Sequence, residues 1–304
     1  MKYINLFSKK YKKVLSFDGG GVRAIMGVYF LKRLEQETSR SIFDSFDLFI
    51  GTSAGAINAL MLGINGSSIT DIEEFWTKAN LRKIMNQSFI DKTSILQTRP
   101  KYSNVGKKEI LSRFFADKEI GAALKPVIVT AYDLEKRQPV LISSYKDSKV
   151  SVVEAANASS AAPIYFPTAG MNDGRWLIDG GIATNNPSLL GYVEAKKLFG
   201  TNNIKILGIG AGLNKRKING RRSKNWGALG WLRHDILGIM LESSLQNEIL
   251  KDLVGDNYLR VNSSIQKVNR RMDDISDQNL IRIKDLSDEW WSKFGKKAIN
   301  FLNS

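Results

Sequence analysis

Short apolar runs alternate with longer amphipathic segments along the chain. Apolar runs of strand length occupy residues 13–17, 46–50, 126–131, 139–143, 176–178, 204–209 and 258–261. Segments with the apolar spacing of a helix occupy residues 22–37, 55–62, 105–115, 151–159, 187–199, 232–253 and 290–302. Ser151 and Glu154 have the spacing of a capping box that would start the helix at 151–159. Strands that alternate with helices predict an α/β fold of three layers, α/β/α, with a largely parallel central sheet.

The length of 304 residues suits one large domain, and no internal repeat divides the sequence. We expect a basic N-terminal extension at residues 1–12, followed by a single domain at 13–304. Within this domain, residues 211–230 predict a long basic loop and residues 266–304 a C-terminal helical tail. No stretch reads as a secretory signal or a membrane span, so we expect a cytoplasmic protein that is peripheral at membranes.

The residue types present exclude several kinds of chemistry. The chain has no Cys, which excludes disulfides, a thiol nucleophile and thiolate metal sites. Its single His excludes zinc sites that need two imidazoles, and it leaves His234 as the one candidate for a Ser–His–Asp triad. Metal sites built from carboxylates alone remain open.

The formal charge of +15 is concentrated in two stretches. Residues 1–16 hold five Lys and no acidic residue, and residues 214–224 hold six cations and no acidic residue. Such stretches indicate an anionic partner, either a membrane surface or a nucleic acid. Solvated surface segments without a partner would have the same composition.

The first candidate motif is Asp-Gly-Gly-Gly-Val-Arg at residues 18–23, where a predicted strand meets a predicted helix. Glycines let the backbone approach an anion closely, and the free amides at the start of a helix point toward it. The motif lacks the Lys-Ser/Thr pair of a P-loop and the glycine spacing of a dinucleotide site.

The second motif is Gly-Thr-Ser-Ala-Gly at residues 51–55, again between a strand and a helix. A Gly-x-Ser-x-Gly element in this context is typical of a nucleophile elbow, a tight turn that exposes the Ser53 hydroxyl. The amide of Ala54 would then lie beside an oxyanion that develops during acyl transfer.

A serine nucleophile needs a base, and two candidates are present. The order Ser53, Asp179, His234 matches that of α/β-hydrolases. An α/β-hydrolase, however, has several strands before its nucleophile elbow, whereas only two predicted strands precede Ser53 here. Asp179, in an Asp-Gly-Gly motif at the end of a predicted strand, is the other candidate and would act directly on the hydroxyl. With an ordinary pKa near 4, Asp179 would produce no loss of rate near pH 6.5, where a His would titrate.

Together these motifs resemble those of the patatin-like phospholipase family, serine acyl hydrolases that use a Ser–Asp dyad. Residues 18–23 resemble the family's oxyanion motif, residues 51–55 its nucleophile motif and residues 179–181 its Asp-Gly-Gly motif. Residues 158–166, 226–250 and 258–261 are also similar to family members, so the resemblance covers roughly residues 13–265.

The resemblance implies a patatin-like catalytic domain that cleaves fatty-acyl esters of membrane glycerophospholipids through an acyl-enzyme, as phospholipase A or lysophospholipase. It implies that Ser53 is the nucleophile and Asp179 the base, and that no metal or organic cofactor is needed. It also implies supporting roles for the first motif: an oxyanion hole of the amides of Gly19, Gly20 and Gly21, and Arg23 as support for that loop or for a lipid phosphate.

Bacterial members of the family include membrane-damaging defence effectors switched on by cyclic nucleotides and toxins delivered into host cells. The resemblance therefore leaves open an activator, either a small molecule or a protein. It does not choose the biological setting, the headgroup, the acyl position or the oligomeric state.

The cations at 214–224 precede Trp226 and Trp231 and the predicted helix at 232–253. Cations beside tryptophans suit an anionic headgroup interface, so we expect this segment to dock on bilayers and partly cover the site. A solvated loop followed by a core helix explains the same pattern.

Two other functions fit parts of the sequence. One is an α/β-hydrolase esterase that uses Ser53 and His234. The other is a catalytically idle basic binding protein whose cations meet nucleic acid, although no nucleic-acid-binding motif is present and no specific nucleic acid is expected.

Overall fold

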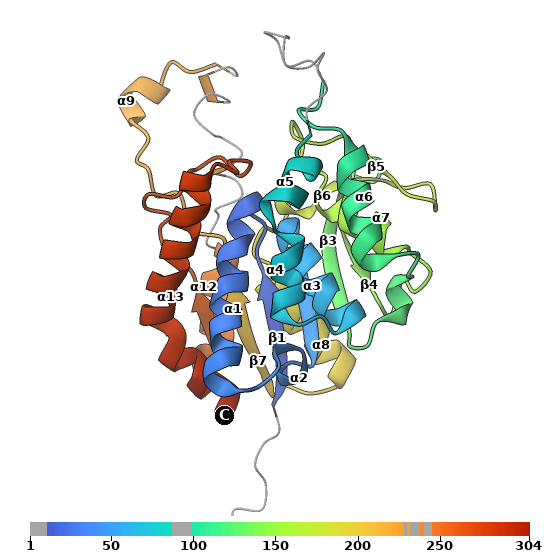
Figure 1. The fold of residues 1–304 in the computed structure, drawn as a ribbon, viewed down its shortest axis with the longest axis vertical. Coiled ribbons are helices and arrows are strands. Elements are labelled where there is room, and N and C mark those ends of the chain that lie inside the picture. Colours follow the sequence, from blue (N-terminus) through green and yellow to red (C-terminus); the bar gives the residue numbers. More distant parts are fainter. Residues whose placement is uncertain (1–10, 87–98, 228–229, 232–237, 240–244) are drawn as a thin grey trace, which may run out of the picture.

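The computed structural model describes residues 11–86, 99–227, 230–231, 238–239 and 245–304 (Figure 1). One sheet has the strand order β5-β6-β3-β2-β1-β7-β8, and β4 also pairs with β3. The strands are β1 (Lys12–Phe17), β2 (Leu48–Thr52), β3 (Val127–Asp133), β4 (Gln138–Ser143), β5 (Ala169–Gly170), β6 (Trp176–Asp179), β7 (Ile204–Ile209) and β8 (Tyr258–Val261). Strands β3, β2, β1, β7 and β8 run parallel, whereas β4, β5 and β6 join antiparallel. The predicted strands and the largely parallel sheet are therefore confirmed.

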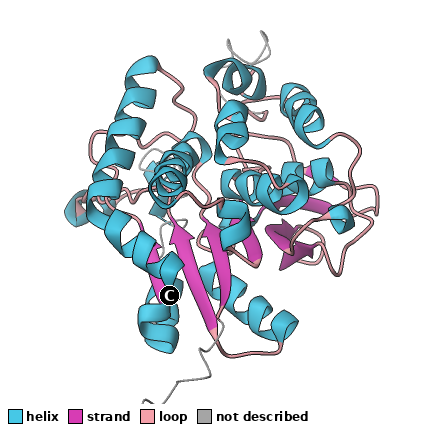
Figure 2. Cartoon of the chain, turned by 60° about the horizontal axis from the view of Figure 1, so that its bottom comes forward, coloured by secondary structure: helices cyan, strands magenta, loops and turns pink. Residues whose placement is uncertain are grey.

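Helices lie on both faces of the sheet, as the strands between two helical layers in Figure 2 show. The helices named below are α1 (Ile25–Thr38), α2 (Ile42–Ser45), α3 (Ala54–Asn65), α4 (Ile69–Phe75), α5 (Lys78–Ile84), α6 (Asn104–Phe115), α7 (Val152–Ser159), α8 (Ser188–Phe199), α9 (Gly220–Ser223), α12 (Leu245–Val254) and α13 (Asp277–Asn303). Short 3-10 turns are η1 (Gly21–Ala24), η2 (Ile120–Ala122), η3 (Gly180–Ile182) and η4 (Gly255–Asn257). This arrangement confirms the three-layer α/β/α fold.

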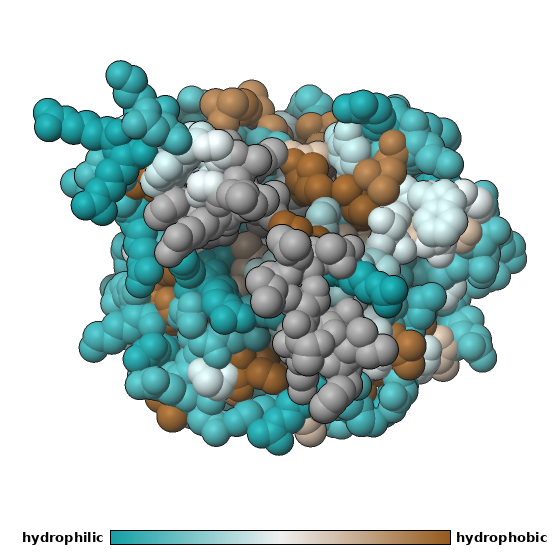
Figure 3. Space-filling view, turned by 90° about the horizontal axis from the view of Figure 1, so that it is seen from above, coloured by the Kyte–Doolittle hydropathy of each residue, from teal (hydrophilic) through white to brown (hydrophobic). Residues whose placement is uncertain are grey.

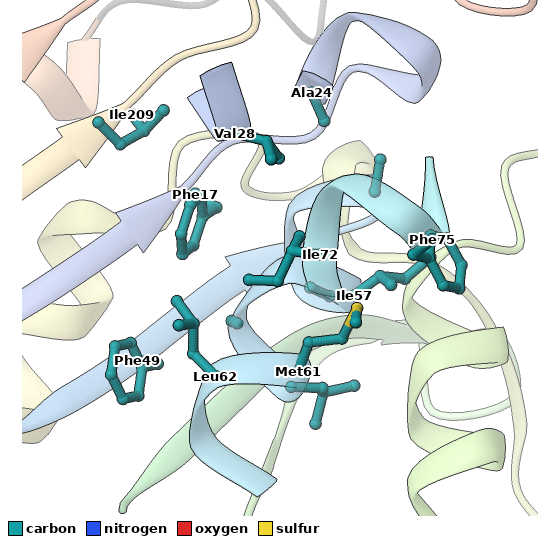
Figure 4. Packing of buried hydrophobic residues seen from close by; sticks show 14 of the residues in the cluster. Phe17, Ala24, Val28, Phe49, Ile57, Met61, Leu62, Ile72, Phe75 and Ile209 are labelled. Carbon is teal, nitrogen blue, oxygen red and sulfur yellow. The ribbon is translucent and has the colours of Figure 1, made fainter. Parts of the chain in front are cut away.

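The alternation of side chains along the strands divides the core into two parts. Leu15 and Phe17 of β1 face the larger cluster, which also holds apolar side chains of α1, α3, α4 and α13. Val14, their neighbour, faces the smaller cluster, which includes Ala195 of α8 and Leu250 of α12. Figure 4 shows part of the larger cluster, where Phe17 and other strand residues pack beside the helices. Burial on both faces explains why these strands read as continuous apolar runs.

The C-terminal helix α13 is much longer than the predicted helix at 290–302, because it begins at Asp277 and has 27 residues. The Ser276 side chain caps it by accepting a hydrogen bond from the amide of Asn279 at 3.3 Å. Its buried residues, such as Trp290, belong to the larger core cluster, and Ser287 Oγ donates to the Met26 carbonyl of α1 at 2.9 Å. The segment expected as a tail thus packs against α1 as part of one helical layer.

Two local predictions differ from the structure. No side-chain bond from Ser151 caps α7, and the Glu154 carboxylate instead accepts from the amide of Asn172 at 3.0 Å, so the predicted capping box is wrong. The predicted helix at 22–37 starts with the 3-10 turn η1 before α1. Of the predicted helix at 232–253, residues 232–237 and 240–244 lie outside the described residues, and residues 245–253 are helical in α12. Helices α2, α4 and α5 were not predicted, and the first two begin at capping serines.

Candidate active site

Ser53 occupies a strained turn between β2 and α3. Its backbone angles are φ 55° and ψ −125°, a combination that is uncommon for a residue with a side chain. The flanking glycines allow this turn to be tight. A Cβ on Gly51 would lie 2.3 Å from the carbonyl oxygen of Gly55, and one on Gly55 would lie 2.6 Å from that of Phe17. The turn therefore has the geometry of a nucleophile elbow.

Strand pairing brings the ends of β2 and β6 together. Strand β4 pairs with residues 128–133 along one edge of β3, so β2 and β6 share the other edge. Thr52, at the end of β2, pairs with Thr130, and Asp179, at the end of the antiparallel β6, pairs with the next residue, Ala131. The residue after Thr52 is Ser53, so it meets the carboxylate of Asp179.

The Ser53 hydroxyl lies close enough to the Asp179 carboxylate to lower its pKa. Asp179 is 5% exposed, and its Oδ1 also accepts a hydrogen bond from the amide of Gly181 at 2.8 Å. Burial raises the pKa of Asp179 to about 6, while the Ser53 hydroxyl, the Gly181 amide and the charge of Lys107 lower it. The carboxyl group is thus a stronger base near neutral pH than the ordinary aspartate that we expected from the sequence.

The glycine loop after β1 lies against the elbow. A Cβ on Gly19 would stand 3.2 Å from Ser53 Cβ. The amide of Gly19 donates to the Asn185 carbonyl at 3.1 Å, so this amide is already engaged. Within the described part of the chain, the amides of Gly20 and Gly21 donate no hydrogen bond.

Two arginines lie behind this loop. Arg260 of β8 binds the Asp18 carboxylate with both terminal nitrogens, and its Nη1 is 2.8 Å from Oδ1. Arg23 is 2% exposed, and its amide donates to the Gly20 carbonyl at 3.2 Å. This burial favours support of the loop over direct contact with a lipid phosphate. Arg260 falls in the stretch 258–261 that resembles family members, but nothing local marks its partner 242 residues away.

The comparisons with known proteins agree with this geometry. The family model for patatin-like phospholipase matches residues 15–190, which include the glycine loop, the elbow and Asp179. The chain belongs to the patatin-like phospholipase family.

Relatives of this family are similar over most of the chain. Patatin-like protein 1 of Arabidopsis thaliana is 29% identical over 82% of this chain and 73% of its own length. The cGAMP-activated phospholipase of Pseudomonas aeruginosa is 28% identical over 82% of this chain and 77% of its own length. VipD from Legionella pneumophila has the same fold, with a TM-score of 0.54 and 15% identity over 97% of this chain and 67% of that one. Such family members imply that this patatin-like protein is a lipid hydrolase.

Three further polar residues lie around the elbow, and none of them was assigned a role from the sequence. Ser159 Oγ accepts a hydrogen bond from the Ser53 amide at 3.0 Å, and Asn185 holds the Gly19 backbone through its carbonyl and side chain. Lys107 is buried and donates a hydrogen bond to the carbonyl of Ser160, the residue after Ser159. Ser159 falls in the stretch that resembles the family, but Lys107 carries no such signal. His234, the alternative base, lies outside the described residues.

The basic segment, residues 214–224, lies at the end of this patatin-like domain where the parallel strands finish. Its six cations are exposed, and α9 projects at the top of Figure 1. Trp226 and Trp231 follow it and pack edge to face, with ring centroids 5.4 Å apart. In Figure 3, which looks onto this end, hydrophilic side chains project on the α9 side and hydrophobic ones gather beside the grey atoms.

No helix in the described ranges combines the length and apolar character needed to cross a bilayer. Nor do the described Asp and Glu side chains form a group of three or more that could hold a metal ion.

Proposed function

We propose that this protein hydrolyses fatty-acyl ester bonds of membrane glycerophospholipids, with Ser53 as the nucleophile and Asp179 as its base. The close approach of these two side chains, at a strained turn, carries the proposal. The family membership supports a lipid as the substrate. The reaction is acyl transfer from the lipid to Ser53 and then to water.

In the first half-reaction, Asp179 takes the hydroxyl proton while Ser53 Oγ bonds to the ester carbonyl carbon. The tetrahedral oxyanion then collapses, the lysolipid oxygen leaves, and Asp179 returns the proton to it. In the second half-reaction, Asp179 takes a proton from water as the water oxygen attacks the acyl-enzyme. The fatty acid leaves, and the proton passes to Ser53 Oγ, which restores the free enzyme.

The oxyanion hole of this proposal is smaller than the sequence implied. Because the Gly19 amide is engaged by Asn185, we assign the hole to the amides of Gly20, Gly21 and Ala54. Ala54 is the first residue of α3, where amides lack a partner within the helix. Fixed amide donors of this kind stabilise an oxyanion by about 3 kcal/mol each.

We further propose that the basic segment binds an anionic membrane surface and that the protein acts as a membrane-degrading effector. Six exposed cations next to two tryptophans support this docking surface. They lie at the end of the sheet where β1 and β2 lead into the glycine loop and the elbow. Docking there would present the site to the bilayer.

We also propose that an activator controls the activity, since one relative is named a cGAMP-activated phospholipase. The assay for the proposed function is therefore run with and without a cyclic dinucleotide. Protein is incubated with mixed phospholipid vesicles, and fatty acids and lysolipids are measured by mass spectrometry. Parent protein is expected to release both, and Ser53→Ala to release neither above background.

Two further variants separate the Ser–Asp dyad from a triad. Asp179→Asn is expected to lose activity by at least about a thousandfold, whereas His234→Ala keeps most of the activity. The reverse result would establish the α/β-hydrolase alternative. Parent protein that binds generic DNA in a gel shift, with no lipid product under either assay condition, would support the idle binding protein instead.

A further inference from the structure

Lys107 is a buried cation in the interior of this domain. It belongs to α6, which packs against α7, and the residue is 1% exposed. Its Nζ donates to the Ser160 carbonyl at 3.0 Å and approaches Ser160 Oγ at 3.3 Å. The ammonium also lies 3.9 Å from the ring centroid of Phe166. Lysine is rarely buried without a partner, because removing its charge from water is costly, so this position calls for an explanation.

Three consecutive residues connect Lys107 to the proposed dyad. Ser159 Oγ accepts a hydrogen bond from the Ser53 amide at 3.0 Å. The next carbonyl, that of Ser160, accepts from Lys107, and the following one, that of Ala161, accepts from the Asp179 amide at 3.1 Å. The nucleophile, the lysine and the carboxylate are thus attached to one short segment at its successive residues.

The charges around Asp179 make this attachment electrostatically important. The groups that act on its carboxyl are the Ser53 hydroxyl, the Gly181 amide and Lys107, the one cation among them. Burial lowers the pKa of Lys107 to about 7, while Asp179 raises it and the exposed Lys108 lowers it further. A positive charge close to a buried carboxylate favours its ionised form.

We propose that Lys107 is a positioning residue that keeps the Asp179 carboxylate ionised and fixes residues 159–161 against the elbow. The proposal rests on the proposed function, because it concerns the base of that reaction. Its charge acts through Asp179, and its hydrogen bonds act through Ser160. The two effects are separable, because glutamine retains donors for Ser160 but carries no charge.

The test measures how fast a fluorophosphonate probe labels Ser53 between pH 5 and pH 9, in parent protein, Lys107→Gln and Lys107→Met. Both variants are expected to move the acid midpoint of labelling upward by about one pH unit, as expected for loss of a nearby opposite charge. Lys108→Met, the neighbouring exposed lysine, is the matched control and is expected to keep the parent midpoint. Thermal unfolding of each variant is measured beside the labelling.

A second readout does not depend on reactivity at all. The carboxyl carbon of Asp179 is titrated by carbon-13 NMR in the Ser53→Ala background, with and without Lys107→Gln, and its midpoint is expected to rise by a similar amount. The role proposed for the charge would be overturned by unchanged midpoints in both readouts. It would also be overturned if Lys107→Gln behaved as parent while Lys107→Met lost only thermal stability. Parent protein that does not label at Ser53 would instead contradict the proposed function, while the NMR titration would still test Lys107.

Discussion

Gly19 lies so close to Ser53 that a side chain at position 19 would crowd the nucleophile. A Cβ on Gly19 would stand 3.2 Å from Ser53 Cβ and 2.4 Å from Asn185 Oδ1. Asn185 in turn accepts from the Gly19 amide and donates to the Gly19 carbonyl, at 3.1 and 3.2 Å. The glycine loop can therefore lie this close to the nucleophile because residue 19 has no Cβ.

Gly19→Ala is expected to lower lipid hydrolysis by about a hundredfold, because a displaced loop loses an oxyanion donor. The melting temperature is expected to change little, since the Asn185 side chain can rotate away. Gly227→Ala is the matched control, because no atom lies within 4 Å of a Cβ at that exposed position, which is outside the basic segment. Equal loss of activity in both variants would contradict this explanation.

The activity is expected to fall as the pH drops through about 6. Burial raises the pKa of Asp179 to about 6, and only the ionised carboxylate can take the Ser53 proton. Below this value, kcat/KM is expected to decrease tenfold per pH unit. The check is a pH profile of fatty-acid release from vesicles, with protein integrity verified by circular dichroism at each pH.

This expectation differs from the one based on the sequence alone, which assumed an ordinary aspartate and no titration near pH 6.5. An acid limb near pH 6 is therefore no sign of histidine in this protein. The same profile measured on His234→Ala provides the distinction, since the limb is expected to persist. A limb that disappears in His234→Ala would assign it to the imidazole.

Asp179 is also expected to cost stability at neutral pH. Its pKa is raised from 3.8 to about 6 on folding, so its contribution to stability is fully present below pH 4 and is lost as the pH rises through 6. Asp179→Asn removes the buried charge and is expected to increase the free energy of unfolding by about 3 kcal/mol at pH 8, and little at pH 4. Urea unfolding at both values measures this, with the exposed Asp117→Asn as the control. A decrease at pH 8 would show that the carboxylate stabilises the fold.

Local motifs were readable from the sequence, whereas contacts between distant segments were not. The elbow at residues 51–55 follows from its own glycines, which exclude side chains by contact with each other and with β1. The meeting of Ser53 and Asp179 depends on how β2 and β6 share an edge of β3, a pairing that no local pattern encodes. The resemblance to known family members supplied that step.

The burial of Lys107 was also not predictable from its local sequence. Lys107 stands in a Lys-Lys-Glu stretch, which reads as the exposed face of a helix. Its burial depends on packing between α6 and α7, and its partner Ser160 is 53 residues away. Likewise, α13 was underestimated because its first half is rich in charged residues, although its apolar positions pack on α1.

The ion pair of Arg260 and Asp18 is expected to be important for stability. The two side chains are 18% and 6% exposed, so loss of the arginine would leave a buried carboxylate unpaired. Arg260→Met is expected to lower the free energy of unfolding by about 3 kcal/mol. Arg113→Met is the control, because its pair with Glu74 is long, at 3.8 Å, and both side chains are more than half exposed. Equal effects of the two substitutions would contradict the role of burial.

The basic segment offers a prediction about membranes that does not depend on catalysis. Four of its cations, Lys215, Lys217, Arg221 and Arg222, are changed together to Gln in the Ser53→Ala background. Each cation near an anionic surface contributes about 1 kcal/mol, so binding to vesicles containing phosphatidylserine is expected to weaken at least about a hundredfold. Binding of the unsubstituted segment is expected to weaken with added salt, because screening reduces this attraction.

The matched control changes four exposed lysines of α13, Lys284, Lys293, Lys296 and Lys297, to Gln. Both variants lose the same net charge, so a general effect of charge would weaken binding equally. A local docking surface weakens it only in the basic segment variant, because α13 covers a side of the sheet whereas α9 projects beyond the end where the parallel strands finish (Figure 1). Vesicle sedimentation at low salt measures both, and equal losses would mean that the segment is merely solvated.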